Sequence, residues 1–305
     1  MIAFVIRRIA TMLLVLLCVV SVTFLLVRLT PSGPFTQERK LPPEAEKALM
    51  ARYKLDGTLW QQYLTYMGDL LHGDLGISTK YRNRTVNEIL EQTLPITATV
   101  GSLAFLLATV GGVSLGAWAA LKRGTWQEAG AMLFSILAIS IPTFVTGPLL
   151  ILFFAIKLRW FPVGGIGSPS ALVLPAITLA GPYVAYIARL TRTSLLEVLG
   201  QDFVRTARAK GLNEWRVVSK HAAKVAILPV ISFLGPLAAN LLTGSIVVET
   251  IFNIPGAGIF FVSSIENRDS FLLGGVVIVY CTLLMVLNLL VDIGYTWLDR
   301  RIKLA

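Results

Sequence analysis

Residues 96–121 read ITATVGSLAFLLATVGGVSLGAWAAL and contain no charged side chain. A helix needs about 20 apolar residues to cross the hydrocarbon core of a bilayer, because lipid offers no partner to backbone polar groups. This stretch therefore predicts a membrane-spanning helix, and with it the fold class: an all-α membrane protein.

Five further apolar blocks of similar length flank this one, so we expect a polytopic protein with six transmembrane helices. They cover residues 9–29, 130–156, 171–188, 225–248 and 272–297, and the block at 171–188 is the shortest. The composition agrees, since 55% of the 305 residues are hydrophobic and only 14% are charged, against about 25% charged in soluble proteins. An ordinary soluble protein is excluded.

The distribution of basic residues predicts the orientation. Arg7 and Arg8 precede the first block, which is too long for a signal peptide and lacks a small-residue cleavage site, so it is expected to be a retained span. With the amino-terminal segment, loops 122–129 and 189–224 and the tail from 298 in the cytoplasm, that side holds 15 Lys and Arg against 5 acids, and the other side holds 12 against 11. The positive-inside rule then places both termini in the cytoplasm. Attraction to anionic lipid accounts for the net charge of +10 without any nucleic-acid partner.

Three parts follow from this arrangement. Residues 1–29 form the amino-terminal segment and first span, and residues 30–95 an extracytoplasmic helical insertion with short amphipathic helices within 41–69. Residues 96–305 form a five-helix core with a cytoplasmic coupling loop at 192–224.

The most informative part of that loop is residues 201–229, QDFVRTARAKGLNEWRVVSKHAAKVAILP. Asp202 is a suitable N-cap for a helix over 203–210, and Gly211 suits the left-handed position that ends it. Asn213 can cap a second helix, with Glu214 in its first turn. The pattern predicts a short helix, a glycine turn and a long helix below the membrane. The alternative is a solvated basic loop that serves only topology.

The loop resembles the signature of a known family, the permease subunits of bacterial binding-protein-dependent ABC importers, and within it the oligopeptide/dipeptide (OppB/DppB-like) branch. Arg205-Thr206-Ala207 occupies the place of Glu-Ala-Ala, Gly211 that of the glycine, and Ile227-Leu228-Pro229 the ending. The arginine in place of the acid and the longer spacing are what this branch looks like. Further matching segments lie along almost the whole chain: Pro34-Phe35-Thr36, Leu41-Pro42-Pro43-Glu44, His72-Gly73-Asp74, Glu249-Thr250-Ile251-Phe252, Pro255-Gly256-Ala257-Gly258 and Asn267-Arg268-Asp269.

The resemblance implies the type I ABC importer permease fold and a non-catalytic subunit of the bacterial cytoplasmic (inner) membrane. The subunit would form half of a peptide pathway, together with a second homologous permease, two cytoplasmic ABC ATPases that bind ATP and Mg, and an extracytoplasmic peptide-binding protein. Coupling to the ATPases would run through residues 203–217. Arg205 and Arg208 would pair with acidic groups of an ATPase, while Phe203 and Val204 would pack in its groove. The full set of expected coupling residues is Phe203, Val204, Arg205, Thr206, Ala207, Arg208, Gly211, Leu212 and Trp215.

We expect no catalytic, cofactor-binding or metal site in this chain. No G-x-x-x-x-G-K-[ST] phosphate loop occurs, so energy is expected to come from another polypeptide. His72 and His221 are predicted on opposite sides of the membrane, which excludes a histidine pair for a metal. Residues 112–116, GVSLG, match a nucleophile elbow with Ser114 as nucleophile, but they lie inside a predicted span. The spacing of Ala108, Gly112 and Gly116 indicates close helix packing instead; an intramembrane hydrolase using Ser114 stays as an alternative.

Prolines concentrate in the third to fifth spans and predict kinked helices along the translocation pathway. The candidate pathway and gate residues are Pro142, Pro182, Pro236, Asn240, Glu249, Pro255, Gly256 and Gly258. Glu249 is expected to end the fifth span at the outer face, before a glycine-rich turn at 255–258. Kinks that serve only packing, and a plain connecting loop, would look the same.

Asp292 near the end of the sixth span is expected to form a structural ion pair with Arg189 or Arg192 rather than to bind substrate. The substrate itself stays open among dipeptides, longer peptides and a peptide-like metal complex such as a nickel complex. A passive channel is the remaining alternative from another class.

Overall fold

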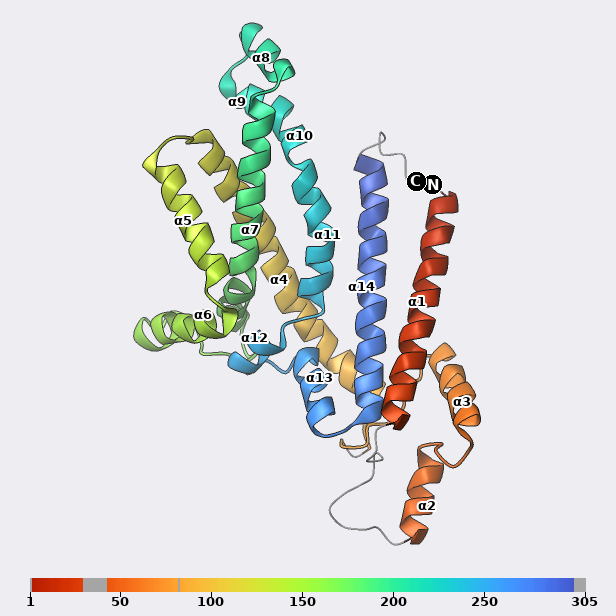
Figure 1. Ribbon diagram of the computed structural model, residues 1–305. Coiled ribbons are helices and arrows are strands. Elements are labelled where there is room, and N and C mark those ends of the chain that lie inside the picture. The colour runs from red at the N-terminus through yellow and green to blue at the C-terminus, as the bar shows by residue number, and fades with distance from the viewer. Residues whose placement is uncertain (1, 30–42, 82, 299–305) are drawn as a thin grey trace. The chain divides into compact units, whose positions relative to one another are not determined.

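The computed structural model describes residues 2–29, 43–81 and 83–298, which form helices joined by short connections (Figure 1). Within these residues there is no β-strand, and the one β-type pairing is an isolated antiparallel bridge between Ile77 and Thr85. The predicted all-α fold class is confirmed.

Four of the predicted spans are continuous apolar helices long enough to cross a membrane. They are α1 (Ile2–Leu29), α4 (Val86–Leu121), α7 (Val173–Leu199) and α14 (Ser270–Leu298), and a 3₁₀ turn at Pro169–Leu172 leads into α7. The sequence placed these spans correctly but made two of them too short, since α4 begins ten residues before the predicted start at 96 and α7 ends eleven after the predicted end at 188.

The predicted third span is broken rather than continuous. Helix α5 (Trp126–Ser140) is followed by α6 (Thr143–Leu150) and a π-helical segment, η1 (Ile151–Lys157), and the two halves meet at an angle of 107°. Pro142 is the N-cap of α6. Because proline has no N–H to continue the hydrogen bonding of α5, the chain is extended at Ile141 and turns there. The predicted span over 130–156 is therefore two helical halves, and their break at Pro142 agrees with the kink that the prolines predict.

The predicted fifth span is also interrupted. Short helices α9 (Glu214–Arg216), η3 (a π-helical segment, Val217–Ala222) and α10 (Ala223–Ala226) lead to α11 (Leu228–Leu242), with a bend of 52° between Ala226 and Leu228. Pro229 lies in the first turn of α11, where its missing N–H is tolerated. Gly244, with φ +90°, ends this run, and a separate helix α12 (Ile246–Ile251) follows. The predicted span 225–248 thus covers the end of α10, all of α11 and the start of α12.

Three shorter helices complete the chain, besides α8 of the coupling loop. The short helices expected within 41–69 are present as α2 (Pro43–Arg52) and α3 (Leu59–Leu71). A capping box begins α3: the Gln61 N–H donates to Thr58 Oγ1 and the Thr58 N–H donates to Gln61 Oε1. Helix α13 (Ala257–Glu266) precedes α14.

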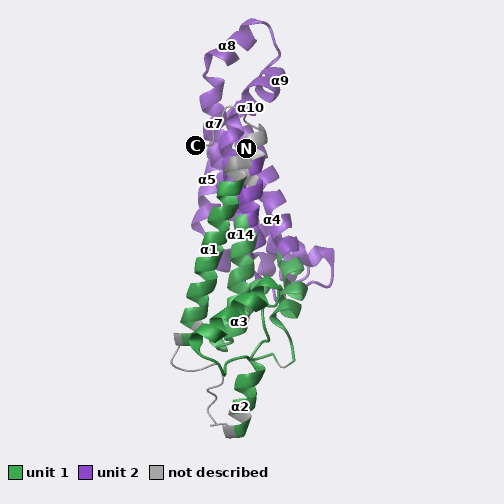
Figure 2. Ribbon diagram, turned by 90° about the vertical axis from the view of Figure 1, so that its right-hand side faces the viewer, with its two compact units in different colours: residues 1–97, 255–285 green, residues 98–254, 286–305 purple. Residues whose placement is uncertain are grey.

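The chain divides into two compact units (Figure 2). Unit 1 comprises Met1–Thr97 and Pro255–Met285, and unit 2 comprises Ala98–Ile254 and Val286–Ala305. The core of unit 1 joins the start of α4, through Val86, Ile89 and Leu90, to Leu272 and Val276 of α14. Each unit thus has a core built from segments far apart in the sequence.

Unit 2 depends on close contact between α4 and α7. A Cβ atom added at Gly116 would lie 2.3 Å from the carbonyl oxygen of Ala188, and one at Gly112 would lie 2.6 Å from Cβ of Ile187. Ala108, one turn earlier, is fully buried. The predicted small-residue packing is confirmed. Because residues 112–116 lie inside a helix and not at a strand-to-helix turn, they do not form a nucleophile elbow around Ser114.

Candidate coupling site and pathway residues

Residues 201–215 of the coupling loop form two short helices, α8 and α9, joined by a turn beyond the end of α7 (Figure 1). We call this segment the elbow. Helix α8 (Asp202–Ala209) ends before Gly211, whose φ of +78° is the left-handed conformation that the sequence predicts. Oδ1 of Asn213 accepts a hydrogen bond from the Trp215 N–H at 2.9 Å and so caps the next helix, as expected. The N-cap of α8 differs: it is Gln201, with no side-chain cap, and Asp202 is the first helical residue.

The inner face of the elbow packs within this chain. Val204 is completely buried and Ala207 is 5% exposed, and both belong to one apolar cluster with Leu195 of α7 and Val217 of η3. Leu212 packs against the same cluster. The expectation that Val204 packs into a groove on a partner is therefore wrong; this side chain holds α8 against the chain's own helices.

The outer face of the elbow carries the remaining expected coupling side chains. Phe203 is 40% exposed and Trp215 is 72% exposed. Arg205 and Thr206 are exposed as well, and Arg205 Nη1 lies 3.6 Å from Asp202 Oδ1. Phe203 and Trp215 are thus the exposed large aromatic side chains of this loop. They form the most prominent apolar feature of the outer face.

Arg208 and Glu214 close the elbow across the glycine turn. The Arg208 guanidinium donates from Nε to Glu214 Oε2 at 3.1 Å and from Nη2 to Oε1 at 2.6 Å. These hydrogen bonds lower the pKa of the Glu214 carboxyl below its ordinary value. The sequence predicted that Arg208 would pair with an acidic group of a partner, whereas in this structure its pairing group is in the same chain.

A second ion pair joins the start of α5 to α7. Arg192 donates to Glu128 Oε1 from both Nε, at 2.7 Å, and Nη2, and Glu128 Oε2 accepts from the Gly124 N–H at 2.6 Å. The sequence analysis did not identify this pair, although Glu128 is the only acid in the loop 122–129. Arg192 is thereby engaged with a group other than Asp292.

The other proposed pair, between Asp292 and Arg189, stays a prediction. Arg189 is exposed on α7. The side chain of Asp292 lies outside the described residues.

Two of the pathway prolines lie within long helices, Pro182 in α7 and Pro236 in α11. The residue after Pro182, Tyr183, donates its hydroxyl hydrogen bond to Asn240 Oδ1 at 2.9 Å. This bond connects the half-buried Tyr183 of α7 to the exposed Asn240 of α11 within unit 2. A polar bridge between two proline-containing helices is compatible with a pathway wall, which stays a prediction.

The expected gate segments have a different local structure from the prediction. Glu249 does not end the fifth span; it lies in the separate helix α12 and is 2% exposed. Residues 255–258 do not form an open glycine turn. Gly256 is the N-cap of α13 with an ordinary φ of −91°, Gly258 is buried within that helix, and the Ala257 N–H donates to Thr97 Oγ1 at 2.9 Å. Pro255, just before the cap, is exposed.

Known proteins match this chain over nearly its full length. A family model described as the binding-protein-dependent transport system inner membrane component matches residues 112–304, and the corresponding amino-terminal model matches residues 1–101. The chain is 42% identical to the oligopeptide transport system permease protein OppB of Salmonella typhimurium, over 99% of this chain and 100% of that protein. It is also 42% identical to the dipeptide transport system permease protein DppB of Bacillus subtilis, over 99% and 98%.

Solved structures support the fold. The inward-facing MetNI methionine ABC transporter matches with a TM-score of 0.59 at 17% identity, over 70% of this chain and 97% of that chain. An amino acid ABC transporter solved with histidines matches with a TM-score of 0.52 at 16% identity, over 68% and 93%. With its long apolar helices, the chain is a multi-pass membrane protein. It belongs to the family of binding-protein-dependent transport system inner membrane components.

Proposed function

We propose that this chain is a permease subunit of an ATP-driven importer of oligopeptides or dipeptides in the bacterial cytoplasmic membrane. The alignments with two relatives named for these substrates cover 98–100% of each relative and 99% of this chain. The subunit forms half of the translocation pathway and carries out no bond cleavage itself. A peptide-like nickel complex is the alternative substrate.

The proposed topology has six spans, with each of the two bent helix pairs counted as one. Both termini lie in the cytoplasm, which the ratio of 15 basic to 5 acidic residues on that side supports. The elbow at 201–215 is then cytoplasmic, and residues 30–95 are extracytoplasmic.

The observation that carries the proposed coupling is the two-faced elbow. Its inner residues, Val204 and Ala207, fasten α8 to α7 and η3, while Phe203 and Trp215 stay exposed. A partner that binds the exposed aromatic residues and moves would therefore displace α7 together with α8. ATP and Mg bind to the two partner ATPases, and nucleotide can shift the permease only through its different affinity for the two conformations. A second permease and an extracytoplasmic peptide-binding protein complete the assembly.

Reconstitution tests this function directly. The affinity-tagged chain, expressed with its neighbouring transport genes and purified in mild detergent, is expected to bring down two ATPases and a second permease. In proteoliposomes supplied with the binding protein, labelled peptide uptake should require ATP. Comparing the uptake of labelled dipeptides, longer peptides and a nickel complex identifies the substrate. Uptake by this chain alone, without ATP or ATPases, would instead establish a passive channel.

The coupling role has its own test. Phe203→Ala and Trp215→Ala should each weaken ATPase binding and lower peptide uptake, because both side chains are exposed and support no core of this chain. Trp160→Ala provides the control, since Trp160 is similarly exposed (65%) but lies outside the elbow. Normal ATPase binding by both elbow variants would refute the proposed contact.

A further inference from the structure

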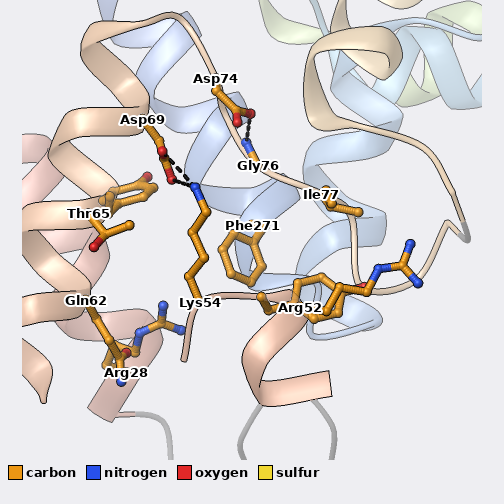
Figure 3. A pocket seen from close by; sticks show the side chains of 12 residues that line it. Arg28, Arg52, Lys54, Gln62, Thr65, Asp69, Asp74, Gly76, Ile77 and Phe271 are labelled. Carbon is orange, nitrogen blue, oxygen red and sulfur yellow. Dashed lines mark hydrogen bonds and ion pairs between the residues drawn. The ribbon is translucent and has the colours of Figure 1, made fainter. Parts of the chain in front are cut away.

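A polar basin opens beside the end of α1 in unit 1 (Figure 3). Its lining comes from α1, α2, α3, the segment 74–77 and α14. The volume is about 80 Å³. A buried water needs roughly 10–15 Å³ of such space, so the basin has room for about five water-sized groups, which is the size of one phosphate group.

The charges in the basin leave an excess of cations. Lys54 Nζ is paired with both carboxylate oxygens of Asp69, at 2.9 and 2.8 Å, and Asp74 Oδ1 accepts from the Gly76 N–H at 2.9 Å (Figure 3). Two arginines, Arg28 and Arg52, also line the basin, and no carboxylate among the described residues pairs with them. The basin therefore suits an anion.

The guanidinium of Arg28 lies beside two aromatic rings and lacks one hydrogen-bond acceptor. Its guanidinium carbon lies 5.2 Å from the ring centre of Phe24 and 5.7 Å from that of Phe271, and its Nε–H is buried with no hydrogen-bond partner. A buried donor without an acceptor costs about 1–3 kcal/mol. Tyr66 lines the same basin, and burial raises its pKa to about 12, so its hydroxyl remains a donor at neutral pH. A bound anion would supply the acceptor that Arg28 lacks.

An apolar crevice adjoins the basin. A second cavity of about 20 Å³ shares Arg28, Tyr66 and Phe271 with it and continues along Thr23 of α1 and Gly274 of α14. These last two residues lie toward the interior of the apolar segments Ile6–Leu26 and Ser270–Leu290. The charged basin thus shares lining residues with an apolar crevice whose other lining residues belong to the apolar segments of α1 and α14.

The surrounding surface has the character of a membrane interface. On the last turns of α1, Val22, Leu25 and Leu26 are 49–64% exposed, and on α3 Trp60 and Leu64 are 66% and 52% exposed. Exposed tryptophan beside an amphipathic helix is typical of the boundary between headgroups and acyl chains. The basin includes Arg28, which follows directly after the apolar segment Ile6–Leu26 of α1.

We propose that this basin binds the phosphate of an anionic phospholipid, with Arg28 as its ligand and an acyl chain against the crevice and the exposed face of α1. Arg52, which donates from Nη2 to Asn83 Oδ1 at 3.3 Å on the opposite side of the basin, adds positive charge at the rim (Figure 3). Arginine binds phosphate oxygens with paired donors, which suits a phosphodiester. A peptide carboxylate fits less well, because the crevice is lined by the apolar segments of α1 and α14 and the basin holds only one small group. The proposal does not depend on which solute the transporter carries.

Native mass spectrometry of the full chain in mild detergent tests the site by titration with phosphatidylglycerol. Arg28→Gln should weaken the tightest-binding lipid about tenfold, the effect of losing one hydrogen bond to a charged group. Arg52→Gln should weaken it by a smaller factor, because Arg52 contributes charge from the rim. Arg84→Gln is the control, because Arg84 belongs to the same unit, bonds to Gln92 and does not line the basin. Arg52 is exposed, so its variant remains informative if Arg28→Gln does not fold.

Four further additions distinguish the possible ligands. Diacylglycerol, which lacks the phosphate, should bind weakly and without dependence on either arginine, whereas phosphatidylethanolamine should retain part of the affinity. Inorganic phosphate that binds in an Arg28-dependent way while phosphatidylglycerol does not would overturn the lipid assignment, as would an Arg28-dependent tripeptide. Equal lipid binding by all three variants would overturn the site.

Discussion

The guanidinium of Arg208, in the last turn of α8, and the carboxylate of Glu214, the first residue of α9, form two hydrogen bonds across the turn at Gly211. Both side chains are about half exposed. The pair therefore contributes little to overall stability but restrains the angle between the two helices of the elbow.

Opening this pair should loosen the elbow without unfolding it. We expect Arg208→Glu to speed amide hydrogen exchange over 203–215 by about two- to fivefold, since exposed pairs contribute about 0.2–1 kcal/mol. The reversed pair Arg208→Glu with Glu214→Arg should restore slow exchange. If the single reversal exchanged as slowly as wild type, the ion pair would not restrain the elbow.

The same pair has a defined pH dependence. Because the folded-state pKa of Glu214 lies below its ordinary value of 4.5, its contribution is present above pH 4.5 and is lost as the pH falls through the lowered folded value. Hydrogen exchange of the elbow, corrected for intrinsic rates, should thus be constant from pH 8 to pH 6 and increase only in acid. A step near pH 7 would contradict the assignment.

Gly211 should be needed for coupling because of its backbone conformation. Its φ of +78° is strained for a β-branched residue, and an added Cβ would meet no atom within 4 Å, so the cost is conformational rather than steric. Gly211→Val should lose about 1–2 kcal/mol in the elbow and lower peptide uptake per ATP hydrolysed. Gly200→Ala is the control, with φ −82° and an ordinary contact of 3.4 Å. Normal coupling in Gly211→Val would refute the rigid elbow.

Close packing of α4 on α7 should make Gly116 intolerant of even one methyl group. In Gly116→Ala the new Cβ would meet the Ala188 carbonyl oxygen at 2.3 Å, which forces the helices apart at about 1–3 kcal/mol. Gly130→Ala, where no atom lies within 4 Å, should be neutral or slightly stabilising. Thermal unfolding of both variants in the same detergent measures the difference; equal midpoints would show that the helices accommodate the methyl group.

The Glu128–Arg192 pair should stabilise the junction of α5 and α7. Glu128 is 9% exposed, so Glu128→Gln leaves a partly buried guanidinium without its charged acceptor and should lower the thermal unfolding midpoint. Glu197→Gln, which changes an exposed glutamate on α7, is the matched control. The double variant Glu128→Gln with Arg192→Gln should recover part of the loss. Equal unfolding midpoints for the Glu128 and Glu197 variants would contradict this role.

Local signals predicted the parts of the structure that local physics determines. The conformation at Gly211 and the cap at Asn213 depend on a few adjacent residues, and both follow the prediction. The break at Pro142 was indicated by the proline itself, yet its angle depends on the packing of α6, which contacts α7 and α12 within unit 2.

Features that depend on contacts between distant segments could not be predicted from the local sequence. Val204 has the appearance of an exposed docking residue on an isolated helix, and only the positions of Leu195 and Val217 make it buried. Glu128 and Arg192 are 64 residues apart, so no spacing rule connects them. The sequence therefore predicted the two helices of the elbow, but not which face is buried against this chain and which face is exposed.

The buried carboxylate of Asp269 accepts hydrogen bonds from the Ser78 hydroxyl and the Thr79 N–H, which precede it by 191 and 190 residues. Together with the contact of Leu272 and Val276 with Val86, this places the closing elements of unit 1 near the end of the chain. During synthesis the ribosome must therefore complete most of the polypeptide before the segment made first can acquire its final partners. A chain truncated before residue 269 would leave the amino-terminal helices incompletely folded in the membrane, as substrates for quality-control proteases.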